Sequence, residues 1–147
     1  MCSWCYGFQP TIRALVERDH AITVALGSLG SDRARPMRDS DKAKVRQHWE
    51  HVSDRSGQPF DFGFFDRDDF VYDTAPSCGA VAIVRARFPA LAVPFLGRLQ
   101  ERFYALGQDI TDAAILREAV SEFGIDPAVF DQALRDPATA VEINAEW

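Results

Sequence analysis

The sequence predicts an α/β chain in which one helix and one strand are followed by an all-helical second half. Three observations predict this class. Apolar residues recur at helical spacing over residues 3–17, they alternate with small residues over 21–29, and the capping signals from residue 74 onward are all helical. The 147 residues suffice for one domain, or for a small domain with part of another.

The first expected helix spans about 3–17. Apolar residues at spacings of three and four form one stripe along it: Trp4, Phe8, Ile12 and Leu15. Pro10 lies inside this stretch and has no backbone N–H, so we expect a kink or a displaced hydrogen bond there. This helix therefore begins at a cysteine pair and carries one apolar face.

A strand is expected over 21–29, where apolar residues alternate with small ones and two glycines mark the end. A polar loop at 31–38 follows. A second helix is expected over 39–55, with Trp49 on its apolar face and Gly57 just beyond its end. Residues 60–72 are aromatic without a clean period, which indicates an irregular loop with rings anchored in the core.

The second half predicts a module of four or five short helices. Thr74 is a candidate N-cap with Pro76 in the first turn. Two further helices are expected over 91–106 and 112–123, the second capped by Thr111. Asp126-Pro127 and Asp136-Pro137 each resemble an N-cap followed by proline at the first helical position; these pairs complete the set of expected helix starts.

Composition excludes several classes of function. The net charge is −6, which gives no support for nucleic-acid binding, because phosphate contacts need a basic face. No apolar run approaches the roughly 18 residues of a membrane span, and the first residues lack the pattern of a signal peptide. Three cysteines are too few for a disulfide-stapled secreted scaffold. We therefore expect a cytoplasmic protein without nucleic-acid or membrane partners.

The motif with the clearest chemistry is Cys2-Ser3-Trp4-Cys5, at the start of the first expected helix. A helix start favours negative charge and can lower a thiol pKa from about 8.5 to roughly 3.5–7. The spacing brings the second sulfur close enough to form a disulfide. We expect Cys2 to be the exposed nucleophile and Cys5 the partly buried resolving thiol, with Ser3 and Trp4 tuning the sulfur's surroundings.

Other uses of these residues remain open. A Cys-x-x-Cys pair can be half of a zinc site, and the further ligands would come from Cys78, His20, His48 and His51. None of these forms a second close pair of the usual kind, so no metal is expected. Two inert packed cysteines are a further alternative. Cys78 itself is either a small buried residue or a thiol activated at a helix start, and burial is favoured.

Several segments together resemble DsbA-family oxidoreductases of the FrnE-like type. They are residues 1–8 (MCSWCYGF), 48–52 (HWEHV), 56–60 (SGQPF), 72–78 (YDTAPSC), 99–104 (LQERFY) and 107–111 (GQDIT). The first motif is shared by many thioredoxin-like proteins, whereas the combination is far more specific and covers essentially the whole chain. The resemblance implies a thioredoxin-like fold with an inserted helical domain, and Cys2 and Cys5 as its redox pair.

This family pattern implies two parts. Residues 1–38 correspond to a partial thioredoxin-like portion with the Cys-x-x-Cys helix and one strand, and residues 39–147 to the mainly helical insertion. The family's first strand and its C-terminal strands, one of which follows a cis-proline, have no counterpart in this sequence. We expect an edge at 21–29 that is left unpaired, and therefore a chain that associates with itself or is poorly stable.

The leading functional interpretation is a thiol–disulfide oxidoreductase that needs no cofactor. Its expected partners are protein or small-molecule thiols and disulfides, with glutathione and a second copy of the chain as further candidates. One alternative is a glutathione-dependent transferase or isomerase of the kappa or hydroxychromene-carboxylate isomerase type, although those enzymes generally lack the second cysteine. The other alternative is a non-catalytic helical fragment that binds proteins.

Overall fold

The computed structural model describes residues 2–27, 35–137 and 139. Helices and loops account for all of these residues, and no strand occurs among them. The elements in chain order are α1 (Ser3–Gly7), α2 (Gln9–Val16), α3 (Asp39–Ser56), η1 (Phe62–Asp66), α4 (Ala75–Arg87), η2 (Pro89–Leu91), α5 (Ala92–Tyr104), α6 (Ala113–Glu122) and α7 (Pro127–Arg135), where η marks a 3-10 helix. None of the described helices combines the length and apolar character needed to span a bilayer.

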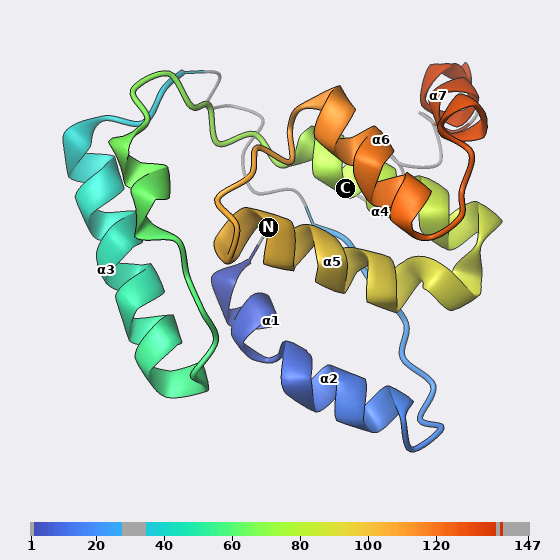
Figure 1. The fold of residues 1–147 in the computed structure, drawn as a ribbon, viewed down its shortest axis with the longest axis horizontal. Helices are drawn as coiled ribbons and strands as arrows, with labels where there is room; N and C mark the ends of the chain where they lie inside the picture. Colours follow the sequence, from blue (N-terminus) through green and yellow to red (C-terminus); the bar gives the residue numbers. More distant parts are fainter. Residues whose placement is uncertain (1, 28–34, 138, 140–147) are drawn as a thin grey trace.

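The helices form two groups with α1 between them (Figure 1). On one side α4, α5, α6 and α7 pack against one another, and on the other side α3 packs against η1. The short helix α1 contacts both α3 and α5. The cysteine pair therefore lies at the junction of the two groups.

The core is aromatic near α3 and aliphatic near α4. Trp49 is 1% exposed, and rings from several segments surround it; its ring neighbours are Phe60, Phe64, Phe65, Phe103 and Tyr104. The expectation of buried aromatic anchors between residues 60 and 72 is thus confirmed. Tyr6 and Val24 belong to the same buried cluster, so the N-terminal segment shares this core with the helical part.

The expected helix over 3–17 is divided into α1 and α2 around Phe8. Pro10 supplies the physical reason, because it has no N–H to donate to the Tyr6 carbonyl one turn earlier. That carbonyl accepts instead from a backbone N–H at the end of α1 and from the Gln58 side chain, with 3.3 Å between Gln58 Nε2 and Tyr6 O. The displaced hydrogen bond expected at Pro10 is therefore present and is satisfied from another segment.

The expected strand over 21–29 is wrong for the residues that can be judged. Residues 21–27 have no regular secondary structure, and 28 and 29 lie outside the described residues. The alternation itself is real, since Val24 is buried and Ile22 and Leu26 are half-buried between exposed neighbours. A strand, however, needs a ladder partner. The hydrogen bond found for this backbone in the described ranges comes from the Arg85 side chain, whose Nη1 donates to Val24 O at 2.8 Å.

The other helix ends lie where local sequence signals predicted them, but two of the expected N-caps are wrong. Gly57 ends α3 in the left-handed region at φ 70°, as expected. Asp112, not Thr111, caps α6, because its carboxylate accepts from the Ala114 N–H at 2.6 Å. At α4 the Thr74 side chain makes no capping bond, and Asp73 Oδ1 accepts from the Ala75 N–H instead.

The last two expected helix starts differ in outcome. Asp126 caps α7, because its side chain accepts from the Ala128 N–H at 2.8 Å, and Pro127 is the first helical residue. The helix expected after Asp136-Pro137 lies largely outside the described residues, as does half of the polar loop at 31–38.

Candidate active site

Cys2 is the residue that precedes the first turn of α1. Its backbone is extended, with φ −117° and ψ 121°, and its carbonyl accepts from the Tyr6 N–H at 3.1 Å. The amide groups of the first helical turn have no carbonyl partner within the helix. The thiol of Cys2 is therefore attached at the end of a helix where negative charge is favoured.

Cys5 lies one turn further along α1, and its thiol interacts with that of Cys2. Partial burial of the thiol, its hydrogen bond with Cys2 and the charge on Cys2 together raise the pKa of Cys5 to about 11. The Cys5 thiol therefore keeps its proton at neutral pH.

The relative exposure of the two cysteines differs from the expectation. Cys5 is exposed as a residue and Cys2 is half-buried, whereas the reverse was expected. The reason is that Cys5 faces an open groove along α2 and α5. Both are free thiols, and so is Cys78.

Cys78 is a buried residue in the first turn of α4. It is 6% exposed, and this burial raises the pKa of its thiol. Its expected role as a small packed residue agrees with that environment.

Trp4 extends from α1 toward α3. Its ring centroid lies 5.6 Å from that of His51 and 6.2 Å from that of His48, both in edge-on geometry. The side chain is 43% exposed, and both histidines are exposed. One residue between the two cysteines is thus flanked by two imidazoles, a contact that sequence reasoning missed. The spacing of His48 and His51 indicated a shared helix face, but not its orientation toward Trp4.

Below the cysteines, buried tyrosines connect α1 to the core. Tyr6 is 2% exposed and stacks on Tyr104, with ring centroids 5.2 Å apart. The Tyr104 and Tyr72 hydroxyls are 3.5 Å apart. Burial is the first cause that raises the pKa of Tyr72 and of Tyr104, and the charge on Cys2 is a further cause for each, so this pair lies within electrostatic reach of Cys2. Neither of these two tyrosines was expected near the site from sequence.

Ser3 is buried at 6% exposure, which leaves Trp4 as the accessible residue between the two cysteines. A groove of about 650 Å³ borders Cys5 on the other side. Its walls are mostly apolar and include Phe8, Ile12, Val16, Val93 and Leu96. Of the apolar stripe expected on the first helix, Phe8 and Ile12 therefore line this groove instead of a packed core, whereas Trp4 faces α3; Phe8 is 54% exposed and Val16 43%.

No group of three or more metal-ligating side chains occurs within the described ranges. Among the acidic residues between 66 and 69, Asp68 forms an exposed ion pair with Lys42 at 3.0 Å.

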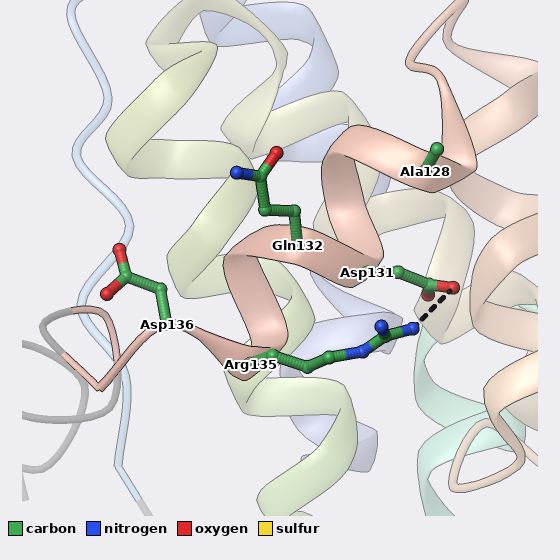
Figure 2. Close-up of a pocket in the computed structure, with 5 residues that line it drawn as sticks. All are labelled: Ala128, Asp131, Gln132, Arg135 and Asp136. Carbon is green, nitrogen blue, oxygen red and sulfur yellow. Dashed lines mark ion pairs between the residues drawn. The ribbon is translucent and has the colours of Figure 1, made fainter.

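A second hollow, of about 520 Å³, lies on α7 (Figure 2). Asp131 and Arg135 point toward each other there, with 3.7 Å between Oδ2 and Nη2. Asp131 also accepts from Arg117 Nε at 2.9 Å. These charges are therefore paired, and the residues that line the hollow include no nucleophile.

The geometry of a thiol pair at a helix start agrees with what comparison with known proteins finds. The family model described as a DSBA-like thioredoxin domain matches residues 1–146. The chain belongs to this DSBA-like family. The expected family is thus confirmed, and with it a thiol–disulfide oxidoreductase in general terms. No curated protein matches the chain.

Two solved structures are similar over nearly the whole chain. One is the "putative protein disulfide isomerase" of Nitrosomonas europaea, with a TM-score of 0.86 and 30% sequence identity, covering 99% of this chain and 71% of the other. The other is the cytosolic disulfide reductase DsbM of Pseudomonas aeruginosa with GSH, with a TM-score of 0.78, 25% identity and coverage of 99% and 71%. Both therefore share the arrangement of helices described above.

Proposed function

We propose that the protein is a thiol–disulfide oxidoreductase that uses Cys2 as nucleophile and Cys5 as resolving thiol. The observation that carries this proposal is the raised pKa of Cys5, caused by burial, by its hydrogen bond with Cys2 and by the charge on Cys2. Because Cys5 holds its proton at neutral pH, the role of nucleophile goes to Cys2, which lies at the start of α1, where negative charge is favoured. The thiolate, not the thiol, attacks a disulfide.

The proposed exchange has two steps. The Cys2 thiolate attacks one sulfur of the substrate disulfide, which forms a mixed disulfide and releases the first substrate thiolate. Cys5 then loses its proton and attacks the Cys2 sulfur, which forms the Cys2–Cys5 disulfide and releases the second thiolate. The substrate gains two electrons and the cysteine pair loses two. The proton that Cys2 gave to solvent and the proton of Cys5 balance the two released thiolates.

We propose that the pair works in the reducing direction in the cytoplasm, with a small thiol such as glutathione restoring the dithiol. The support is the similarity to DsbM, which is described as a cytosolic disulfide reductase and was solved with GSH. Two glutathione molecules would supply the two electrons and leave as glutathione disulfide. Ser3 and Trp4 would tune the pair through the burial and ring contacts described above.

A trapping experiment tests the proposal. The Cys5→Ser variant should accumulate a mixed disulfide at Cys2 when treated with hydroxyethyl disulfide, seen as an adduct by intact mass and placed by peptide mapping. Cys5→Ser/Cys78→Ser is the matched control and should give the same adduct, since Cys78 is buried. An unmodified Cys2 at neutral pH would contradict the proposal. Glutathione turnover that survives Cys5→Ser would favour a transferase or isomerase instead.

A further inference from the structure

One face of α3 carries a row of basic side chains beside the redox motif. Lys44, His48, His51 and Arg55 follow one another at spacings of four, three and four, which places them on the same side of a helix. All four are exposed. The two histidines both contact Trp4 edge-on, so this side of α3 is the one turned toward the cysteines. We refer to these four residues as the basic face of α3.

The positive charges of the basic face are not neutralised by nearby carboxylates. No ion pair joins Lys44 or Arg55 to any carboxylate in the described part of the chain. Of the neighbouring acids on α3, Asp41 pairs with Arg35 at 3.6 Å and Glu50 pairs with Arg46 at 3.2 Å.

Asp54 is the acidic residue next to the basic face, adjacent to Arg55 in the sequence. Asp54 also follows His51 by three residues, so it lies on the same side of α3, but among the described residues it forms no ion pair with Lys44 or Arg55. Lys44 and Arg55 thus outnumber the unpaired carboxylate of Asp54 on this side, and in a chain of net charge −6 a locally basic surface at the candidate active site favours an anionic ligand.

We propose that the basic face of α3 and Trp4 bind the carboxylates of a small anionic disulfide of the glutathione type. The proposal rests on the thiol exchange proposed above and adds the residues that bind glutathione and its disulfide when the dithiol is restored. Glutathione carries its thiol and two carboxylates within one tripeptide. Trp4 lies in the same helical turn as the nucleophile Cys2 and contacts both imidazoles, so a molecule of this size can reach the Cys2 sulfur and the basic face at once.

Each group has a distinct part in this binding. Lys44 and Arg55 supply positive charge at the two ends of the face, and the guanidinium of Arg55 can hold a carboxylate through two parallel hydrogen bonds. The imidazoles of His48 and His51 supply N–H donors near its middle. Trp4 provides an exposed aromatic surface for the peptide backbone of the ligand. The covalent step is the reverse of the glutathione-dependent restoration of the dithiol: the Cys2 thiolate attacks glutathione disulfide, and Cys5 then attacks the Cys2 sulfur, so two glutathione thiolates leave and the cysteine pair becomes a disulfide.

The test compares an anionic with a neutral disulfide. The measured quantity is the ratio of the rate constants with which the reduced protein reacts with glutathione disulfide and with hydroxyethyl disulfide. In Lys44→Gln/Arg55→Gln this ratio should fall about fivefold, because exposed charges contribute modestly to binding. The ratio should also fall with added salt in the unmodified protein.

The matched control is Arg46→Gln/Arg135→Gln, which removes the same charge from other surfaces. Arg46 pairs with Glu50 on another side of α3, and Arg135 is 79% exposed on α7. The control should leave the ratio unchanged. An equal fall in both double variants would show a general charge effect and overturn the proposal, as would a ratio that does not change in either.

A binding measurement separates failure of this inference from failure of the exchange. S-methylglutathione cannot exchange, and its affinity by calorimetry should fall about fivefold in Lys44→Gln/Arg55→Gln. If neither disulfide reacts but this affinity falls, the proposed function is wrong and the docking surface stands. If both disulfides react but the affinity does not change, the docking surface is wrong. A disulfide-bonded acidic peptide of about ten residues serves as a third substrate. If Lys44→Gln/Arg55→Gln slows only the reaction with this peptide, the face binds protein segments and not glutathione, which overturns the proposal.

Discussion

The ring of Tyr6 stacks on the ring of Tyr104, with centroids 5.2 Å apart and 19° between the ring planes. This contact connects the helix that carries the cysteines to α5. On the same ring, the Tyr104 hydroxyl lies 3.5 Å from that of Tyr72. The hydroxyls of buried Tyr104 and half-buried Tyr72 therefore report on the packing of the site.

Alkaline pH should destabilise the protein through these tyrosines. Burial raises the pKa of Tyr72 to about 12 and also raises the pKa of Tyr104. Between pH 10 and 12 the unfolded tyrosine has lost its proton while the folded one keeps it, so the unfolded state binds fewer protons. The stabilisation is thus fully present below about pH 10 and is lost as pH rises, by roughly 2–3 kcal/mol for Tyr72.

Urea denaturation at a series of alkaline pH values measures this loss. Tyr72→Phe keeps the ring and removes the ionising hydroxyl, so its unfolding free energy should fall less steeply above pH 10. Phe103→Leu is the control, because the Phe103 ring contacts that of Tyr72, with centroids 5.6 Å apart, and carries no proton to lose. This variant should be less stable at every pH, but its unfolding free energy should fall with pH above 10 as steeply as that of the unmodified protein. Parallel pH profiles for the protein and Tyr72→Phe would contradict the prediction.

The cysteine pair predicts an unusual effect of Cys2→Ser. The hydrogen bond with Cys2 and the charge on Cys2 are two of the causes that raise the pKa of Cys5, after burial. Removing the Cys2 thiol should therefore lower the pKa of Cys5 and make it more reactive near pH 8. We expect iodoacetamide to modify Cys5 severalfold faster in Cys2→Ser than in the unmodified protein, as measured by peptide mass.

The control for this experiment is Cys78→Ser, which removes a buried thiol that is not among the causes of the raised pKa of Cys5. Its Cys5 should react at the unmodified rate. Slower alkylation of Cys5 in Cys2→Ser than in the unmodified protein would show that Cys2 does not hold the Cys5 proton in place.

Much of the helical half could be predicted from sequence because its signals are local. Asp126 and Gly57 act within one turn of their own helices, and each begins or ends a helix where expected. The strand over 21–29 could not be judged in this way, because a strand depends on a partner far away in the chain. Its alternation predicted burial correctly for Val24 and secondary structure incorrectly.

Of the candidate site, only the closeness of Cys2 and Cys5 could be predicted from sequence. Cys2 and Cys5 are three residues apart in the sequence, so their proximity follows from spacing alone. The contacts of Trp4 with His51 and of Tyr6 with Tyr104 join residues far apart in the chain. They depend on how α1 is placed between α3 and α5, and no local pattern specifies that placement.

Trp49 should be the most sensitive core position. It is 1% exposed and contacts rings from the aromatic loop and from α5. Trp49→Ala should lower the free energy of unfolding by about 3–5 kcal/mol, because it removes transfer free energy and leaves a cavity. Trp4→Ala is the control, since Trp4 is 43% exposed, and should cost less than about 1 kcal/mol in urea denaturation. Similar losses for the two variants would contradict this assignment of the core.

Pro10 and Gln58 should be energetically coupled through the Tyr6 carbonyl. Pro10 cannot donate to that carbonyl, and Gln58 Nε2 does so at 3.3 Å. Gln58→Leu removes one of the two donors to this carbonyl, the other being a backbone N–H at the end of α1, and should cost about 0.5–1.5 kcal/mol of unfolding free energy. Pro10→Ala restores a backbone N–H at the position one turn after Tyr6.

In the Pro10→Ala background, Gln58→Leu should therefore cost less, and the double-mutant cycle should give a coupling of at least about 0.5 kcal/mol. Gln58→Glu keeps the length of the side chain but lacks the donor, so it should behave like Gln58→Leu and separates the lost hydrogen bond from lost packing. Additive effects of Pro10→Ala and Gln58→Leu would mean that the carbonyl is satisfied in another way. The coupling matters for function because Tyr6 follows Cys5 directly, so the same bond fixes the C-terminal end of the helix that carries the redox motif.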